Sequence, residues 1–300
     1  MRRSPRAKAI LQRKASLGRP GTSRGVYYKW QGAHWALVRL ADIGYPAKDE
    51  TLYPMRDRVM GLWLRSSYFR DRESSTVSGA YRVLGSGVPL IDGRSRRCAS
   101  QQGNALLSVV RLGLDDGRCE RLVERLCHWQ WPDGGWNCDV TPSADSSSFM
   151  ETLTPMEGLA AFGKSTGSAG ARRASRRASE VFLRRHLFKR VSDGRVIRPD
   201  FVRLHYPTYY HYDILAGLRG MREVDRLRDS RCDEALDLLE SRRLRDGGWP
   251  AEAKFYRYSP REFAAGAEFV DWGGTSSRRM NPWVTVEAMA VLHSAGRLSV

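Results

Sequence analysis

The sequence predicts an all-α protein in which about five to six helical hairpins close into a ring, an α/α toroid. Apolar residues recur at helical spacing through much of residues 26–300, and only residues 194–198 suggest a short β-hairpin. The predicted helices come in pairs, and similar turns close two of the pairs, at residues 130–136 and 243–249. Paired helices with similar turns indicate a repeat architecture, because each hairpin buries its apolar face only against its neighbours.

The predicted helices are marked by apolar spacing and by the residues at their ends. Ser148 and Glu151 have the spacing of a capping box, in which each side chain bonds to the main-chain amide of the other residue. Asn281 followed by Pro282 is typical of a helix start. Residues 66–95 lack helical periodicity, and we expect them to form a long loop or insertion. Helices are expected at about residues 30–40, 52–64, 100–112, 119–129, 148–162, 171–189, 209–221, 230–244 and 282–294.

Basic residues dominate the charge of the chain. Lys and Arg number 50 against 33 Asp and Glu, which gives a formal net charge of +17. Residues 1–25 are rich in Arg and Lys and contain no acidic residue, so we expect a disordered basic tail ahead of one toroid domain over residues 26–300. Such a tail attracts polyanions without specificity, and we therefore predict no specific nucleic-acid partner. The sequence leaves open a peripheral membrane contact and the oligomeric state.

Cysteine usage and hydropathy bear on the compartment. The five Cys residues have no paired spacing, which predicts free thiols in a reducing compartment. No apolar run reaches the roughly 20 residues that a membrane-spanning helix needs. The N-terminus lacks the apolar segment of a secretory signal. The expected location is therefore the cytoplasm.

The turn at residues 130–136 has a physical logic. The amide of Gln130 can bond to exposed groups at helix ends, and Gly134 permits the positive φ that reverses the chain. The indole of Trp136 can pack over the turn and hold neighbouring hairpins together, so we expect it to be structural. The corresponding residues of the second turn are Arg243, Gly247 and Trp249.

These turn residues resemble the QW repeat of squalene and oxidosqualene cyclases and the related repeats of protein prenyltransferase β-subunits. The resemblance covers roughly residues 95–298, and weakly residues 26–65, and it implies a toroid that binds an isoprenoid. The D-x-D-D element of the cyclases does not occur here, and neither does the Asp-x-Cys pair of the prenyltransferases. Neither activity is therefore transferred residue by residue.

Candidate site residues lie just ahead of the predicted inner helices. In a closed ring these helix starts gather at one rim, where free amides favour anions. We predict catalytic roles for His211 and Asp213, as an acid–base pair, and for Asp139. The predicted substrate-binding residues are Arg97, Cys98, Gln102, Trp136, Cys138, Glu151, His205, Tyr206, Tyr209, Tyr212, Arg279 and Trp283.

Several of these residues are of types that bind zinc. They are Cys98, Cys138, Asp139 and either His205 or His211. Their spacing matches no recognised ligand pattern, so we predict no metal site and no cofactor.

Three functions remain open from the sequence. We expect a terpene cyclase-like or prenyltransferase-like protein that binds an isoprenoid or prenyl diphosphate in a central, aromatic-lined cavity. Whether it is an enzyme stays open. The alternatives are a toroid polysaccharide lyase or hydrolase and a non-catalytic toroid scaffold. An open polar cleft with Asp clusters would favour the polysaccharide enzyme, and a small or filled centre would favour the scaffold.

Overall fold

The computed structural model of the protein describes residues 4–12, 23–261 and 264–298, and most of its regular structure is helical. The strands are short: β1 (Asp71–Glu73), β2 (Val88–Ile91), β3 (Arg94–Ser95), β4 (Arg257–Tyr258) and β5 (Ala267–Glu268). The helices are α1 (Pro5–Leu11), α3 (Ser23–Val26), α4 (Ala33–Asp42), α5 (Tyr53–Trp63), α6 (Val77–Leu84), α7 (Ala99–Arg111), α8 (Arg118–Trp129), α9 (Phe149–Thr166), α10 (Ala169–Leu183), α11 (Ile214–Glu223), α12 (Asp233–Ser241) and α13 (Pro282–Ser294).

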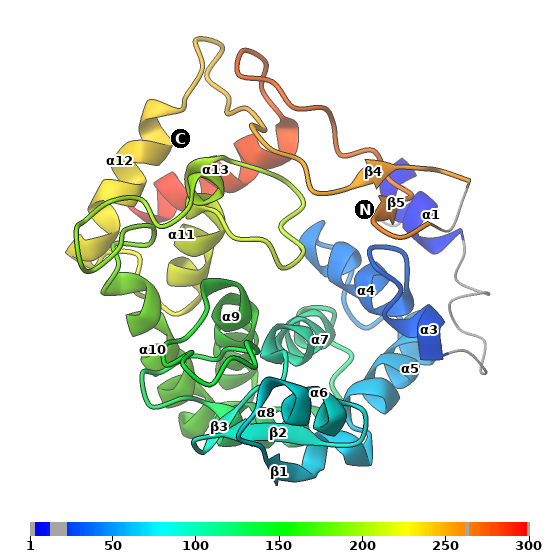
Figure 1. The fold of residues 1–300 in the computed structure, drawn as a ribbon. Helices are drawn as coiled ribbons and strands as arrows, with labels where there is room; N and C mark the ends of the chain where they lie inside the picture. The colour runs from blue at the N-terminus through cyan, green and yellow to red at the C-terminus, as the bar shows by residue number, and fades with distance from the viewer. Residues whose placement is uncertain (1–3, 13–22, 262–263, 299–300) are drawn as a thin grey trace.

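The long helices form two concentric rows (Figure 1). Helices α4, α7, α9, α11 and α13 lie side by side in that order and form the inner row. Helices α5, α8, α10 and α12 each pack against the outside of the inner helix that precedes them in the chain. The predicted pairing of helices is confirmed.

Contacts from α1 and from a loop residue link the two ends of the inner row. Helix α1 packs on α4, and the Arg6 guanidinium lies 4.9 Å from the centre of the Trp283 ring at the start of α13. Nearby, the indole N–H of Trp30 donates to the carbonyl of Phe255 over 3.2 Å. We call these two contacts, Arg6 with Trp283 and Trp30 with Phe255, the seam.

Glycines bring two inner helices into close contact. A Cβ added to Gly103 on α7 would lie 2.3 Å from the main-chain nitrogen of Pro155 on α9. A Cβ on Gly158 of α9 would lie 2.9 Å from the carbonyl oxygen of Gly103. Only glycine permits this backbone-to-backbone approach. It fixes α7 and α9 against each other near the start of α7.

The turn between α8 and α9 joins both helices through Trp136. Its buried indole N–H donates to the carbonyl of Leu126 on α8 over 3.0 Å. Its main-chain N–H donates to the hydroxyl of Thr152 on α9 over 3.1 Å. The side-chain amide of Gln130 donates to the carbonyl of Gly134, which has a φ of +107°. The predicted structural role of this turn is confirmed.

The turn between α12 and α13 repeats these bonds, although the threonine lies 36 residues after the tryptophan here and 16 residues after it in the first turn. The indole of Trp249 donates to the carbonyl of Leu239, again ten residues earlier, over 2.7 Å. Its main-chain N–H donates to the hydroxyl of Thr285 over 2.9 Å. Arg243 takes the place of Gln130 and donates to the carbonyl of Gly247 over 3.1 Å. The two turns are therefore structural repeats, and arginine preserves the helix-end bond.

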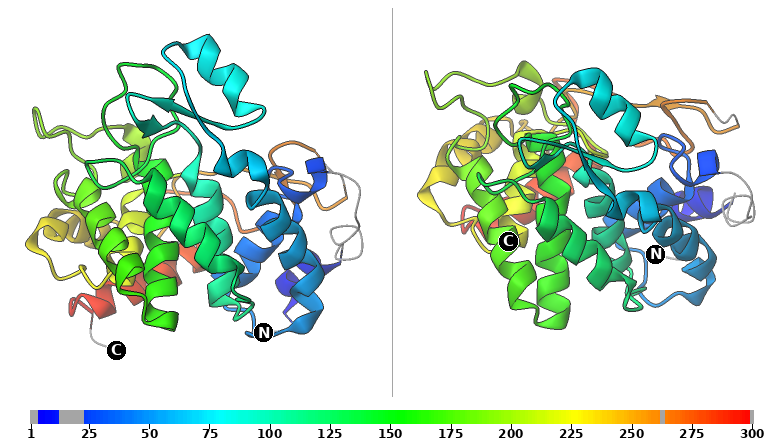
Figure 2. Two further views of the ribbon diagram at one scale, coloured as in Figure 1. Left: turned by 90° about the horizontal axis from the view of Figure 1, so that it is seen from below. Right: turned by 60° about the horizontal axis from the view of Figure 1, so that its bottom comes forward.

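Residues 66–95, expected as a long loop or insertion, form an insertion with regular structure of its own. This segment contains β1, α6, β2 and β3, with β1 parallel to β2 and β3 antiparallel to β2. Its elements are too short to produce a periodic sequence. Ala80 and Ile91 form a small buried cluster with Val140, which lies outside the insertion. The insertion stands over one end of the helical hairpins and leads directly into α7 (Figure 2).

Three further predictions need correction. Residues 5–11 form α1 with Ala7 and Ile10 buried, so this part of the expected tail is ordered, while residues 13–22 lie outside the described part of the chain. Helix α11 begins at Ile214 and not near Tyr209, because Tyr209 has a φ of +51°. At residues 194–198 the structure has a single bridge from residue 196 to residue 189 in place of a hairpin. No helix in the described ranges has the length and apolar character to cross a bilayer.

Candidate functional site

A cleft of about 510 Å³ lies beside the start of α7, under the insertion. Aromatic and aliphatic side chains form much of its wall, with arginines and two cysteines at its rim. The lining residues are Tyr27, Leu62, Trp63, Arg65, Tyr68, Leu84, Arg96, Arg97, Cys98, Gln101 and Cys138. Three of them, Arg97, Cys98 and Cys138, were predicted from the sequence.

The aromatic wall is held together by ring contacts. Tyr27 meets Trp63 edge to face with ring centres 5.2 Å apart, and Tyr68 lies 5.7 Å from Trp63. The Trp63 indole donates to Nδ1 of the buried His34 over 3.1 Å. This fixed set of rings offers a rigid apolar surface to a ligand.

The arginines at the cleft differ in what they contact. Arg97 stacks over the Tyr68 ring at 4.3 Å and donates to the carbonyls of Leu84 and Gly87. Its guanidinium therefore ties the insertion to the start of α7. Arg65 is exposed at the cleft, which leaves its charge accessible to an anionic ligand.

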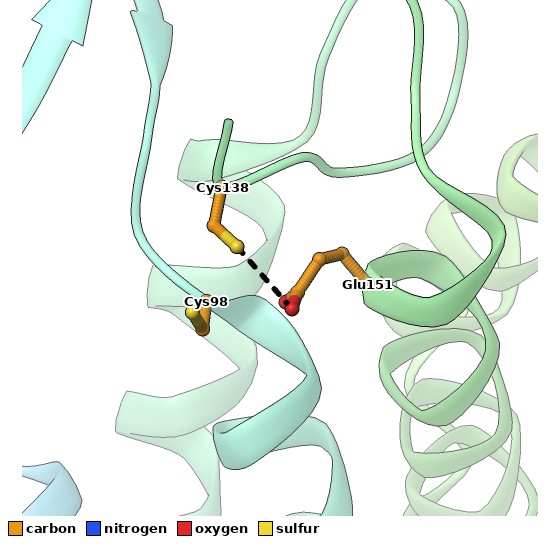
Figure 3. Close-up of side chains that lie close together, drawn as sticks. All are labelled: Cys98, Cys138 and Glu151. Carbon is orange, nitrogen blue, oxygen red and sulfur yellow. Dashed lines mark hydrogen bonds between the residues drawn. The ribbon is translucent and has the colours of Figure 1, made fainter. Parts of the chain in front are cut away.

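Three side chains with metal-binding chemistry meet at the cleft edge (Figure 3). Cys98 is the N-cap of α7, Cys138 lies in the loop after the turn, and Glu151 lies in the first turn of α9. One donor atom from each lies within 4.8 Å of the others, and they are the one such group of three among the described residues. Cys138 and Glu151 follow Cys98 by 40 and 53 residues in the sequence, yet the three side chains form a single cluster.

The cluster replaces the predicted capping box. Ser148 makes no side-chain cap bond at α9. The carboxylate of Glu151 instead accepts from the main-chain N–H of Ser100 on α7 over 2.9 Å and from the Cys138 thiol over 3.4 Å. Burial raises the pKa of the Glu151 carboxyl. The hydrogen bond with Cys98 and burial raise the pKa of the Cys138 thiol.

The two residues of the predicted acid–base pair, His211 and Asp213, contact other residues in the structure. Asp213 is buried at the N-cap of α11, where it accepts from the main-chain N–H groups of Ala216 and His205. Its carboxylate also lies 2.9 Å from Nδ1 of His205. His211 stacks on Phe255 with ring centres 4.0 Å apart, and burial lowers the pKa of His211 to about 4. In the described part of the chain, Asp213 thus contacts the helix cap and His205, whereas His211 packs on Phe255.

The predicted tyrosines lie in the interior between the helices. Tyr209 donates to a carboxylate oxygen of Glu268 over 2.9 Å and stacks on Trp30 at 3.8 Å. Tyr212 donates to the Leu187 carbonyl over 2.7 Å. Two further aromatic candidates stack on each other with ring centres 5.4 Å apart, namely Tyr206 and Trp283. These rings fill the interior and do not line the cleft.

Three further candidates, Asp139, Gln102 and Arg279, lie away from the cleft. Asp139 is exposed and accepts from the main-chain N–H of Thr141, which lowers the pKa of its carboxyl. Gln102 is buried on α7, and no hydrogen-bond partner for its amide lies among the described residues. Arg279 is exposed in the loop before α13. None of the three lines the cleft.

The sequence reasoning missed Tyr27, Trp63 and Tyr68. Tyr27 lies just ahead of an inner helix, so the rim argument applied to the other hairpins would have found it. Trp63 lies on the outer helix α5 and Tyr68 lies in the insertion, and no sequence pattern at either position indicated a ligand site.

No protein-family model matches this chain, and no curated protein matches it significantly. The function is therefore argued from the geometry of the site.

Proposed function

We propose that the chain is an α/α toroid of the squalene cyclase and prenyltransferase type that binds an isoprenoid or prenyl diphosphate in the cleft. The two rows of helices, the seam and the repeated turns support the toroid. The observation that carries the ligand class is the lining of the cleft. Its aromatic wall suits a branched hydrocarbon chain, and the exposed Arg65 suits an anionic head group.

Binding of farnesyl diphosphate to the purified protein tests this proposal. We expect saturable binding in calorimetry, competed by geranylgeranyl diphosphate and not by inorganic diphosphate alone, because the hydrocarbon contributes most of the buried area. Arg65→Glu should weaken binding about tenfold or more, since it reverses the accessible charge at the cleft. Arg228→Glu, at an exposed position on another part of the surface, is the matched control and should leave binding unchanged. No binding, or equal loss in both variants, would refute the proposal.

A non-catalytic scaffold is the second candidate, and the packing of the interior favours it. The cavity among His205, Asp213 and Arg219 measures only about 10 Å³. A buried ion pair between Arg219 and Glu157, 3.2 Å apart, fills the space between α9 and α11. A partner protein would then use an outer surface, and no prenyl diphosphate would bind. The cleft has no cluster of Asp side chains in its lining, so the polysaccharide enzyme has less support.

A further inference from the structure

The cluster of Cys98, Cys138 and Glu151 has the dimensions of a metal site. Tetrahedral zinc with bonds of about 2.3 Å to sulfur and 2.0 Å to oxygen separates its donors by roughly 3.5–3.8 Å. The donor atoms here lie within 4.8 Å of one another, and the Cys138 sulfur is already 3.4 Å from a Glu151 oxygen. Side-chain rotations that move the donor atoms by about 1 Å would place all three within bonding distance of one ion.

No guanidinium or ammonium group in the described part of the chain forms an ion pair with this cluster. Arg96 and Arg97 flank Cys98 in sequence, yet both donate to main-chain carbonyls. No ion pair to Glu151 is formed by the described residues. Two thiols and a carboxyl group therefore lie close together, and the main-chain N–H of Ser100 at the start of α7 donates to the carboxylate. A divalent cation would replace the thiol protons and neutralise the carboxylate.

The surrounding bonds hold the three segments in place. Arg96 donates to the carbonyl of Asp139, next to Cys138, over 3.1 Å. The Trp131 indole donates to the carbonyl of Ser95, three residues before Cys98, over 3.0 Å. Ser100 fixes the orientation of the Glu151 carboxylate. Outer contacts of this kind orient the ligands of metal sites.

We propose that Cys98, Cys138 and Glu151 bind one Zn²⁺ ion, with a fourth coordination position that opens into the cleft. Two sulfur donors select zinc over Mg²⁺ or Ca²⁺. Each thiol forms a sulfur–zinc bond and releases its proton to solvent. Three protein ligands and one open position are typical of zinc that acts on a bound molecule and not of closed structural sites. Both cysteines line the cleft, so a ligand in the cleft can reach the ion. Metal binding stands independently, and only the identity of the molecule at the open position rests on the proposed function.

The test is metal binding by the full chain, kept reduced with a phosphine. We expect about one zinc per chain by mass spectrometry after zinc loading and dialysis. Titration with Co²⁺ should give a thiolate-to-cobalt charge-transfer band and the intense visible bands of tetrahedral cobalt. Cys98→Ser, Cys138→Ser and Glu151→Gln should each weaken binding about tenfold or more.

These variants are chosen to keep the fold. Serine is a better helix N-cap than cysteine at position 98, and glutamine retains an oxygen that accepts from Ser100. Cys127→Ser, at a half-buried thiol on α8 outside the cluster, is the matched control and should bind zinc normally. Circular dichroism reports the helical content of every variant.

Two outcomes would overturn the zinc site. One is no metal binding by a folded chain whose thiols are all free by titration. The other is binding that survives the Cys98→Ser, Cys138→Ser double variant. Failure of the proposed function looks different, because zinc and cobalt would still bind while farnesyl diphosphate would not.

Discussion

The hydroxyl of Thr152 offers a sharp test of how the turns stabilise the hairpins. It accepts from the main-chain N–H of Trp136 over 3.1 Å and donates to the Trp136 carbonyl over 3.4 Å. Thr152 is fully buried. Thr152→Val keeps the shape and branching of the side chain but leaves that N–H without a partner. An unsatisfied buried donor costs about 1–3 kcal/mol, and we expect the free energy of unfolding to fall by about 2 kcal/mol.

The second turn supplies the matched comparison. Thr285 makes the same two bonds to Trp249, but it is partly exposed. Water can therefore replace its hydroxyl, and Thr285→Val should cost only about 1 kcal/mol. Urea unfolding of both variants, followed by far-ultraviolet circular dichroism with the m-value checked, measures the difference. A loss below about 0.5 kcal/mol for Thr152→Val, or a larger loss for Thr285→Val, would refute the reasoning.

Two further predictions concern a helix-end bond and a buried histidine. Gln130→Ala removes a side-chain amide that also donates to the carbonyl of Ala174 on the next hairpin over 2.8 Å. The free energy of unfolding in urea should fall by about 1–2 kcal/mol, and by less for Arg243→Ala, because the bond of Arg243 is exposed to water. Equal losses in the two variants would contradict this. Burial lowers the pKa of His34 to about 3, whereas the unfolded chain takes up this proton near 6.5. The free energy of unfolding should therefore fall by about 1.4 kcal/mol per pH unit as the pH drops from 6.5 towards 3, and His34→Gln, which retains an acceptor for Trp63, should flatten this part of the profile.

The fold was predictable where local chemistry agrees with packing. Glycine and tryptophan at fixed spacing defined both turns, and Asn281 with Pro282 marked the start of α13, where the Asn281 side chain indeed accepts from two main-chain N–H groups. The insertion was not predictable, because strands of two to four residues carry no periodic signal. The start of α11 was placed too early because Tyr209, which bonds to Glu268, has a positive φ that is incompatible with an α-helix.

The site was less predictable than the fold. Glu151 has a strong local signature as a capping residue, and only the close approach of α7 and α9 turns its carboxylate towards Ser100 and Cys138. Sequence spacing describes neighbours along the chain, whereas this cluster depends on neighbours across helices. The predicted aromatic residues lie in the interior for a related reason. A tyrosine such as Tyr212 can form the hydrogen bond of its hydroxyl in the core as readily as in a cavity.

The seam has a consequence for the order in which the molecule assembles. The bond from Trp30 to Phe255 closes a loop of 225 residues, whereas Trp136 and Leu126 are ten residues apart. The free-energy cost of the entropy lost on closing the longer loop is greater by about 3 kcal/mol. Hairpins should therefore form first and join in a row, and the two ends should meet last. The residues that line the cleft all lie between residues 27 and 138, and Tyr27 packs on Trp63 of the same hairpin, so the wall of the cleft can form before this final closure.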